Sequence, residues 1–308
     1  MTSHDFLQSF QDPDYWRQQC PGLSLTLDEF EWNESALPLQ ANTLEQERLR
    51  LWKDGYFCLE SLLPPEDTLR LATAVRSVHK LCELSVFALV FDDFWKLPLQ
   101  LSTALDSFLG GEWELLPDVW VWLLDPQREE SGWKPHRDRG PGRIAKDGQP
   151  QILSFWWALS DATPENGCIY VVPASWDPSY HRYSAGEEHS SLTLQHIRAL
   201  PAPAGSVMGW TSHLLHWGGR ACETASEPRI SVAFEVQRRD FTKQEAFFLP
   251  LKRCPSFSMR LALIARQLLQ YQHMHPLEPA LARECRKLVK TLPGRRSFAD
   301  VLGGWLQK

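Results

Sequence analysis

Two histidines and one aspartate are the residues of this chain that could do metal chemistry. His136 and Asp138 stand in a His-Arg-Asp sequence, and His216 follows 78 residues after Asp138. Two imidazoles and one carboxylate can hold Fe(II) on one face of its octahedron and leave the other positions open for a substrate and O2. The pattern therefore indicates a non-haem iron oxygenase.

The spacing of His136 and Asp138 is that of neighbours on one face of a β-strand. Side chains at i and i+2 point the same way in a strand, so both could reach one metal while Arg137 points elsewhere. The third ligand must then come from another strand. We predict that strand in the apolar, aromatic segment 207–217, which is bounded on both sides by turns containing proline or glycine.

A second histidine lies in the same segment as His216. His213 precedes His216 by three residues, so the two side chains face opposite ways in a regular strand. We therefore expect only His216 to be a ligand and His213 to be structural.

Arg229 opens a strongly β-prone run that ends at Val236. Its i+2 neighbour is Ser231, so in a strand a guanidinium and a hydroxyl would share one face. A guanidinium can grip a carboxylate through a forked ion pair, and the hydroxyl would add a hydrogen bond. The pair is suited to binding an acidic cosubstrate.

The stretch from about Trp133 to Val236 resembles the phytanoyl-CoA dioxygenase family of Fe(II)/2-oxoglutarate oxygenases. The resemblance is carried by His136-Arg137-Asp138, Leu159-Ser160-Asp161, Glu165-Asn166-Gly167-Cys168, Val171-Val172-Pro173-Ala174-Ser175-Trp176, Ala204-Gly205-Ser206, and His216 with Arg229 and Ser231. Residues 54–66 also match the usual entry to this fold.

The resemblance implies a role for each candidate residue. His136, Asp138 and His216 would bind iron, and Arg229 would bind the far carboxylate of 2-oxoglutarate. Trp156, ten residues before Asn166, stands at the family's tryptophan position and would line the cosubstrate pocket. Asn166 itself is expected to form a turn with Gly167.

The sequence departs from the family pattern at a few places. It has Ala174-Ser175-Trp176 after Pro173 where the family usually has Gly-Ser-His, and Gly205-Ser206 where the family often has Gly-Asp. Two residues after the distal histidine the family often has a serine that helps to bind the cosubstrate carboxylate, and here that place is Gly218. The 13-residue interval from His216 to Arg229 is also slightly long.

The activity implied by the resemblance is oxidation of a small-molecule substrate, namely a natural-product, lipid or acyl-type metabolite. O2 and 2-oxoglutarate would be consumed, and succinate and CO2 released. Ascorbate is a candidate reductant. Related halogenating enzymes have a small residue in place of the carboxylate ligand so that chloride can bind the metal. Asp138 keeps that place filled, which favours hydroxylation.

Two other function classes stay open from the sequence. A cupin-like isomerase or a cosubstrate-independent oxygenase would share the barrel without needing Arg229. A non-catalytic binding protein would keep the barrel without turnover. A protein kinase, whose catalytic loop also contains His-Arg-Asp, is excluded because Arg143 stands where that loop needs asparagine and no Asp-Phe-Gly follows.

Composition gives no electrostatic argument for a nucleic-acid or membrane partner. The chain has 308 residues, a net charge of −6 and a pI near 5.9. It contains no uncharged run of 18 apolar residues and no basic segment followed by an apolar stretch at its start. Its seven cysteines are scattered and odd in number, which favours reduced thiols in a cytoplasmic protein.

The expected elements run from helices to strands and back to helices. A helix is predicted over 42–53, with a cap at Asn42 or Thr43 and an end at Gly55, and a second helix opens at Pro65 with Leu69, Ala72, Val75, Val78 and Leu81 on one face. Strands are predicted over 55–60, 119–124, 152–159, 168–172, 206–215 and 229–236, and helices from 256.

This order favours a mainly β fold with flanking helices over a parallel α/β sheet, and the resemblance implies a double-stranded β-helix (jelly-roll, cupin-like) core. We expect one domain, with a helical and strand segment over 1–115, the core at about 116–240 and a helical extension at about 256–308.

Two further features have open interpretations. The segment 134–146 carries five basic residues and is either a solvated loop or a lid that clamps an anionic substrate. The fourteen tryptophans either fill the interior of the core, or include a few that line an apolar or aromatic substrate pocket.

Overall fold

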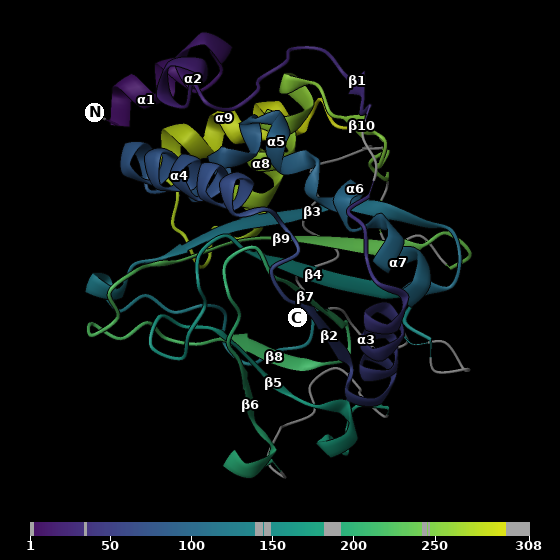
Figure 1. Ribbon diagram of the computed structural model, residues 1–308. Helices are drawn as coiled ribbons and strands as arrows, with labels where there is room; N and C mark the ends of the chain where they lie inside the picture. The colour runs from purple at the N-terminus through teal and green to yellow at the C-terminus, as the bar shows by residue number, and fades with distance from the viewer. Residues whose placement is uncertain are drawn as a thin grey trace.

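Two antiparallel sheets face each other at the centre of the computed structural model, which describes residues 3–33, 36–138, 144, 149–181, 192–241, 245 and 247–293 (Figure 1). Helices cover the outer face of the larger sheet, and the smaller sheet lies against its inner face. This confirms the predicted mainly β, jelly-roll type of fold. Over the described residues the two sheets are not closed into one barrel.

The larger sheet has the strand order β2-β7-β4-β9-β3, and all its neighbouring strands are antiparallel. Its strands are β2 (Tyr56–Leu59), β3 (Trp113–Leu124), β4 (Ile152–Ala158), β7 (Val207–Thr211) and β9 (Arg229–Arg238). The smaller sheet has the order β6-β5-β8, with β5 (Ile169–Val172), β6 (Arg198–Leu200) and β8 (Leu215–Gly218). A separate pair joins β1 (Phe30–Glu31) to β10 (Arg253–Cys254).

Helices precede and follow the strands that build the two sheets. Those before β3 are α1 (Ser3–Ser9), α2 (Pro13–Gln19), α3 (Ala41–Asp54), α4 (Pro65–Cys82), α5 (Asp92–Trp95), α6 (Leu97–Gln100) and α7 (Ser102–Leu109). The last two are α8 (Phe257–Gln270) and α9 (Pro279–Val289). Helices α4, α5, α8 and α9 lie over the larger sheet, whereas α3 packs beside its β2 edge (Figure 1).

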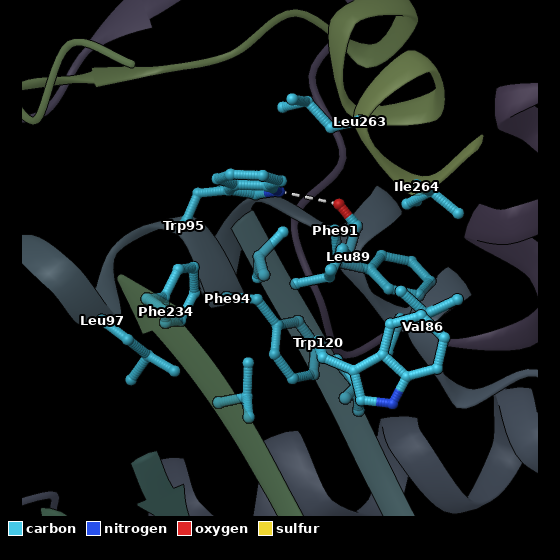
Figure 2. Close-up of a cluster of buried hydrophobic side chains, with 14 of the residues drawn as sticks. Val86, Leu89, Phe91, Phe94, Trp95, Leu97, Trp120, Phe234, Leu263 and Ile264 are labelled. Atoms are coloured by element: carbon cyan, nitrogen blue, oxygen red, sulfur yellow. Dashed lines mark hydrogen bonds between the residues drawn. The ribbon is translucent and has the colours of Figure 1, made fainter. Parts of the chain in front are cut away.

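The main hydrophobic core fills the space between these helices and the larger sheet. Alternate residues of β9, namely Ile230, Val232, Phe234 and Val236, are buried in it. Figure 2 shows Phe234 beside Trp95 of α5, with ring centroids 6.2 Å apart, and the indole Nε1 of Trp95 donates a 2.7 Å hydrogen bond to the Leu89 carbonyl. Burying one such aromatic side chain contributes about 1.5–3 kcal/mol to the free energy of unfolding.

The segment 206–215, predicted as one strand, is divided between the two sheets, so that prediction was wrong. Strand β7 belongs to the larger sheet and β8 to the smaller one, and the Leu214 amide donates to the Thr211 carbonyl in the turn between them. Three polar residues, Thr211, Ser212 and His213, stand at this turn between the two apolar halves, and all three are buried. His213 therefore lies in a turn, and the strand-parity argument does not apply to it.

Three further expectations need correction. Helix α3 begins after Gln40, which makes no side-chain cap, and Asn42 and Thr43 lie inside the helix, although the predicted end at Gly55 is confirmed by its φ of 82°. Leu69 of α4 is 70% exposed rather than on the buried face. Strand β3 begins at Trp113, well before residue 119, because a register shift interrupts its pairing instead of ending the strand.

Candidate metal centre and cosubstrate pocket

The structure brings His136, Asp138 and His216 together. The Oδ1 atom of Asp138 lies 3.4 Å from Nε2 of His136 and 3.3 Å from Nε2 of His216. Two donor atoms held at right angles by bonds of about 2.1 Å to one metal would be roughly 3.0 Å apart. Within the described part of the chain, these three residues are the one group of His, Cys, Asp and Glu with such spacing. The donor set fits a metal ion.

Backbone pairing sets the two histidines face to face. His136 lies in a loop, not in the strand that its spacing predicted, and forms a single antiparallel bridge with His216 of β8. The amide of each residue donates a 3.0 Å hydrogen bond to the carbonyl of the other, and the imidazole centroids are 4.4 Å apart. The alternation expected of a strand still holds locally, because Arg137 points away from the metal centre.

Hydrogen bonds to carbonyl groups set the orientation of both imidazoles. Nδ1 of His136 lies 2.7 Å from the Lys134 carbonyl, and Nδ1 of His216 lies 3.0 Å from the Leu214 carbonyl. A carbonyl only accepts, so each Nδ1 carries a proton, and Nε2 is the ring nitrogen that faces Asp138. The Nε2 of His136 is buried without a hydrogen-bond partner. A cation shared by these atoms would satisfy them.

The protonation states of the group also suit a metal. Burial, followed by the neighbouring His216, lowers the pKa of His136 below its ordinary value, which favours the neutral ring that binds metals. Burial alone would raise the pKa of Asp138, but the two histidines outweigh that effect and hold the pKa well below its ordinary value. Asp138 is therefore a carboxylate.

Two donors hold the second oxygen of Asp138. Its Oδ2 accepts hydrogen bonds from Ser154 Oγ of β4 at 2.5 Å and from Trp210 Nε1 of β7 at 2.8 Å. This leaves Oδ1 as the oxygen that faces both histidines. Sequence analysis missed both donors, although Ser154 is the one polar residue in an otherwise apolar buried strand, and that was a usable signal.

Arg137 has a structural role. At this position the segment 134–146 is therefore neither a solvated loop nor a lid for an anionic substrate, so both predictions were wrong for Arg137. Its guanidinium is buried and lies 2.7 Å from the buried carboxylate of Asp177, and it also donates to the His213 carbonyl. His213 in turn places Nδ1 3.0 Å from the Tyr180 carbonyl and stays outside the metal group. Of the other basic residues, Lys134 is exposed, and Arg139, Arg143 and Lys146 lie outside the described residues.

Arg229 is a buried cation without a carboxylate partner among the described residues. It is 1% exposed, its Nη1 lies 3.4 Å from Ser231 Oγ, and its Cζ lies 5.3 Å from the centre of the Trp156 ring. Its Nε and the Nε1 of Trp156 have no hydrogen-bond partner. Burial lowers the pKa of Arg229 to about 10. The group is arranged for an anion that enters from outside the chain.

The metal group, Arg229 and Trp156 all line one cavity between the two sheets, which has a volume of about 620 Å³ including its open mouth. Ser231 lies behind Arg229 and does not line the cavity. One space thus joins a metal-binding set to a buried positive charge.

A close backbone contact explains the glycine in place of the family serine. A Cβ atom added to Gly218 would lie 2.8 Å from the Cα of Gly132, and one added to Gly132 would lie 2.6 Å from the Cα of Gly218. No side chain fits at either position without moving the backbone. The helper serine is excluded sterically, and Ser231 is the hydroxyl that contacts Arg229.

Asn166 forms the expected turn next to this pocket. Its Oδ1 accepts from the Thr163 amide at 2.8 Å, its Nδ2 donates to the Asp161 carbonyl at 2.8 Å, and Gly167 follows with a φ of 88°. Asn166 therefore supports the wall of the site and does not line the cavity.

Comparison with known proteins agrees with this geometry. The family model for phytanoyl-CoA dioxygenase (PhyH) matches residues 66–229, just over half of the chain and all three candidate metal ligands. A search of curated proteins found no match.

Solved structures with a similar fold include enzymes that use 2-oxoglutarate. The epimerase SnoN from nogalamycin biosynthesis, in complex with Fe3+, alpha ketoglutarate and nogalamycin RO, is 18% identical, with 68% of this chain and 94% of that chain covered and a TM-score of 0.50. The carbocyclase SnoK is 16% identical, with 80% and 94% covered and a TM-score of 0.51. HygX from Streptomyces hygroscopicus, with nickel and 2-oxoglutarate bound, is 14% identical, with 68% and 90% covered and a TM-score of 0.50.

Proposed function

This chain belongs to the phytanoyl-CoA dioxygenase family, and from that premise we propose that it is an Fe(II)- and 2-oxoglutarate-dependent oxygenase acting on a small molecule. The observation that carries the proposal is Arg229, a fully buried cation without a carboxylate partner among the described residues, in the same cavity as two histidines and an aspartate. Such a guanidinium is suited to the distal carboxylate of an acidic cosubstrate.

Fe(II) fits the donor set. His136 and His216 would contribute neutral Nε2 atoms and Asp138 one carboxylate oxygen, which is the two-histidine, one-carboxylate set of non-haem iron oxygenases. Bound Fe(II) would supply O2 activation, while 2-oxoglutarate supplies two electrons and leaves as succinate and CO2.

The side chains around the metal would bind and orient the cosubstrate. Arg229, supported by Ser231, would pair with the distal carboxylate, and the unpartnered Nε1 of Trp156 would be available to a cosubstrate oxygen. A buried charge without a partner destabilises the folded state by several kcal/mol. Binding of the carboxylate would offset that desolvation penalty. Among the described residues, the neighbours of Arg229 are otherwise apolar or uncharged, which strengthens that ion pair.

Hydroxylation is the proposed outcome for the substrate. Asp138 occupies the ligand position that halogenating relatives leave to chloride, and its second oxygen is held by Ser154 and Trp210. The solved structures with a similar fold include an epimerase and a carbocyclase, so the product must be identified chemically.

A cytoplasmic location is proposed from the cysteines. All seven are free thiols in the structure, as the reducing cytosol would keep them. Among the described helices, none is long and apolar enough to cross a membrane.

The test is succinate release from 2-oxoglutarate by the purified protein with Fe(II), O2 and ascorbate. We expect slow succinate formation without substrate and faster formation when extracts containing the substrate are added, and both should be lost in Asp138→Ala and His216→Ala. If calorimetry shows that the protein binds neither Fe(II) nor 2-oxoglutarate, the proposal is contradicted. That result would favour a non-catalytic binding protein.

A further inference from the structure

An aromatic wall forms one side of the cavity beside the metal centre. It consists of Trp120 and Trp122 of β3, Trp133, Tyr271 and His275. Ring centroids are 5.5 Å apart for Trp122 and Trp133, 4.7 Å for Trp133 and Tyr271, and 5.0 Å for Trp120 and Tyr271. The wall is therefore continuous.

The aromatic wall reaches the metal ligands. The ring of Trp133 lies 5.3 Å from the imidazole of His136, and all members of the wall except His275 line the cavity. Trp122 and Trp133 are only half-buried, whereas Trp120 and Tyr271 are buried behind them. A molecule lying on the half-buried rings would be held beside His136.

The cavity contains acidic side chains. Among the described residues that line it, Arg229 is the one cation, and it lies on the Trp156 side assigned to the cosubstrate. The remaining charged residues are the carboxylates Asp118 and Glu235, besides the metal ligand Asp138. Asp118 adjoins the wall directly, because Tyr271 donates a 3.3 Å hydrogen bond to it. Electron-rich ring faces favour apolar rings and cations over a phosphate.

Two members of the wall come from a part of the chain beyond the family match. That match ends at residue 229, whereas Tyr271 follows directly after α8 and His275 lies four residues further on. The ring of His275 stacks on Trp120 at 5.5 Å and lies 6.1 Å from Trp122. The C-terminal helical segment thus completes a surface whose other half is carried by β3.

We propose that the aromatic wall is the substrate-binding surface, and that it takes an uncharged or cationic molecule with a flat ring, not a phosphate or coenzyme A ester. Tyr271 is a specificity-determining residue in this account, because it buttresses Trp120 and Trp133 from the C-terminal segment. The inference rests on the proposed oxygenase function, which places the substrate beside the metal.

The test uses the full chain loaded with Zn(II), which has no redox chemistry, and saturated with 2-oxoglutarate. Three probes share one ring and differ in charge: 2-phenylethanol, 2-phenylethylamine and 2-phenylethyl phosphate. Dissociation constants from ligand-observed NMR titration should be at least tenfold weaker for the phosphate than for the alcohol and the amine. Tyr271→Leu and Trp122→Leu should each weaken alcohol binding at least fivefold.

A matched control is Trp52→Leu, which removes an exposed ring on α3 that does not line the cavity, and should leave the alcohol's dissociation constant unchanged. Circular dichroism checks that each variant is folded. Equal binding of the phosphate and the alcohol, or unchanged alcohol binding in both wall variants, overturns the inference. So does a lack of binding by all three probes.

Calorimetry with 2-oxoglutarate, on the Zn(II)-loaded protein before 2-oxoglutarate is added, distinguishes a failure of the wall inference from a failure of the oxygenase proposal. If 2-oxoglutarate binds and the ring probes do not, the wall inference fails and the oxygenase proposal stands. If 2-oxoglutarate does not bind either, the proposed function itself fails.

Discussion

Two fully buried arginines on opposite faces of the larger sheet differ in one respect. Arg260 of α8, in the helix-covered core, pairs with the buried carboxylate of Asp92 and donates to the Thr26 carbonyl. Arg229, on the cavity side, has no carboxylate partner among the described residues. The first arginine ties α8 to the N-terminal segment. The second would gain a carboxylate partner only from a bound ligand. The presence or absence of a partner within the chain therefore distinguishes a structural arginine of the core from an arginine of a binding site.

The largest effect should come from breaking the complete pair. Asp92→Ala would leave the Arg260 guanidinium buried without its carboxylate, which typically costs about 3–5 kcal/mol. We expect the free energy of unfolding, measured by urea denaturation, to fall by that amount, while the folded fraction still binds 2-oxoglutarate with its normal affinity. A stability close to that of the wild type would show that the Arg260 pair is no more important than a surface ion pair.

Replacing Arg229 should leave stability unchanged and lower the affinity for 2-oxoglutarate, the reverse of the result expected for Asp92→Ala. Arg229→Met keeps much of the side-chain volume and removes a buried, unpaired charge, so the free energy of unfolding should not fall. The affinity for 2-oxoglutarate should fall by roughly 100-fold or more, because a buried charge pair contributes about 2–5 kcal/mol when one partner is truncated. Calorimetry and urea denaturation on the same protein measure both. Loss of stability without loss of affinity would mean that Arg229 is a structural residue like Arg260.

A smaller effect is expected from the hydroxyl that holds Asp138. Ser154→Ala removes the 2.5 Å hydrogen bond to Oδ2, and loss of such outer partners typically weakens metal binding about 10- to 100-fold. Competition titration with a chelating dye measures this. Ser212→Ala is the control, because its hydroxyl is also buried but has no hydrogen-bond partner, and metal affinity should be unchanged. Equal affinities in the two variants would exclude a positioning role for Ser154.

The smallest effect concerns pH. The pKa of His136 is lowered in the folded state, so the unfolded chain binds this proton at a higher pH than the folded chain does. Stability of the metal-free protein should therefore rise with pH up to about 6.5 and level off above it, with a slope of at most about 1.4 kcal/mol per pH unit from this group. Urea denaturation of the wild type and His136→Asn at pH 5.5 and 7.5 measures the difference. A wild-type stability that falls with rising pH relative to the variant would contradict the assignment.

Local spacing made the two halves of the site predictable. His136 and Asp138 are two residues apart, as are Arg229 and Ser231, and such pairs share a face even when, as at His136, the backbone forms only a single bridge. The side of β9 that carries Arg229 was also predictable, because Ile230, Val232 and Val236 lie in the core while Arg229, Ala233 and Glu235 line the cavity.

Contacts that depend on register between distant segments could not be read from the sequence. Ser154 and Trp210 reach Asp138 because β4 and β7 pair with those two residues directly opposite. The turn at His213 contains neither proline nor glycine, the usual turn residues, and the Arg137 ion pair joins residues 40 positions apart. Such features follow from packing of the whole chain and not from local propensity.

The most direct test of the central claim removes the distal carboxylate of the cosubstrate and the guanidinium of Arg229, each alone and both together. With Zn(II) bound, dissociation constants are measured for 2-oxoglutarate and for 2-oxopentanoate, which keeps the keto acid but lacks the distal carboxylate. The wild type should prefer 2-oxoglutarate by roughly 100-fold, in keeping with the energy of a buried charge pair, and Arg229→Met should bind both compounds equally weakly. An unchanged preference for 2-oxoglutarate in Arg229→Met would contradict the account.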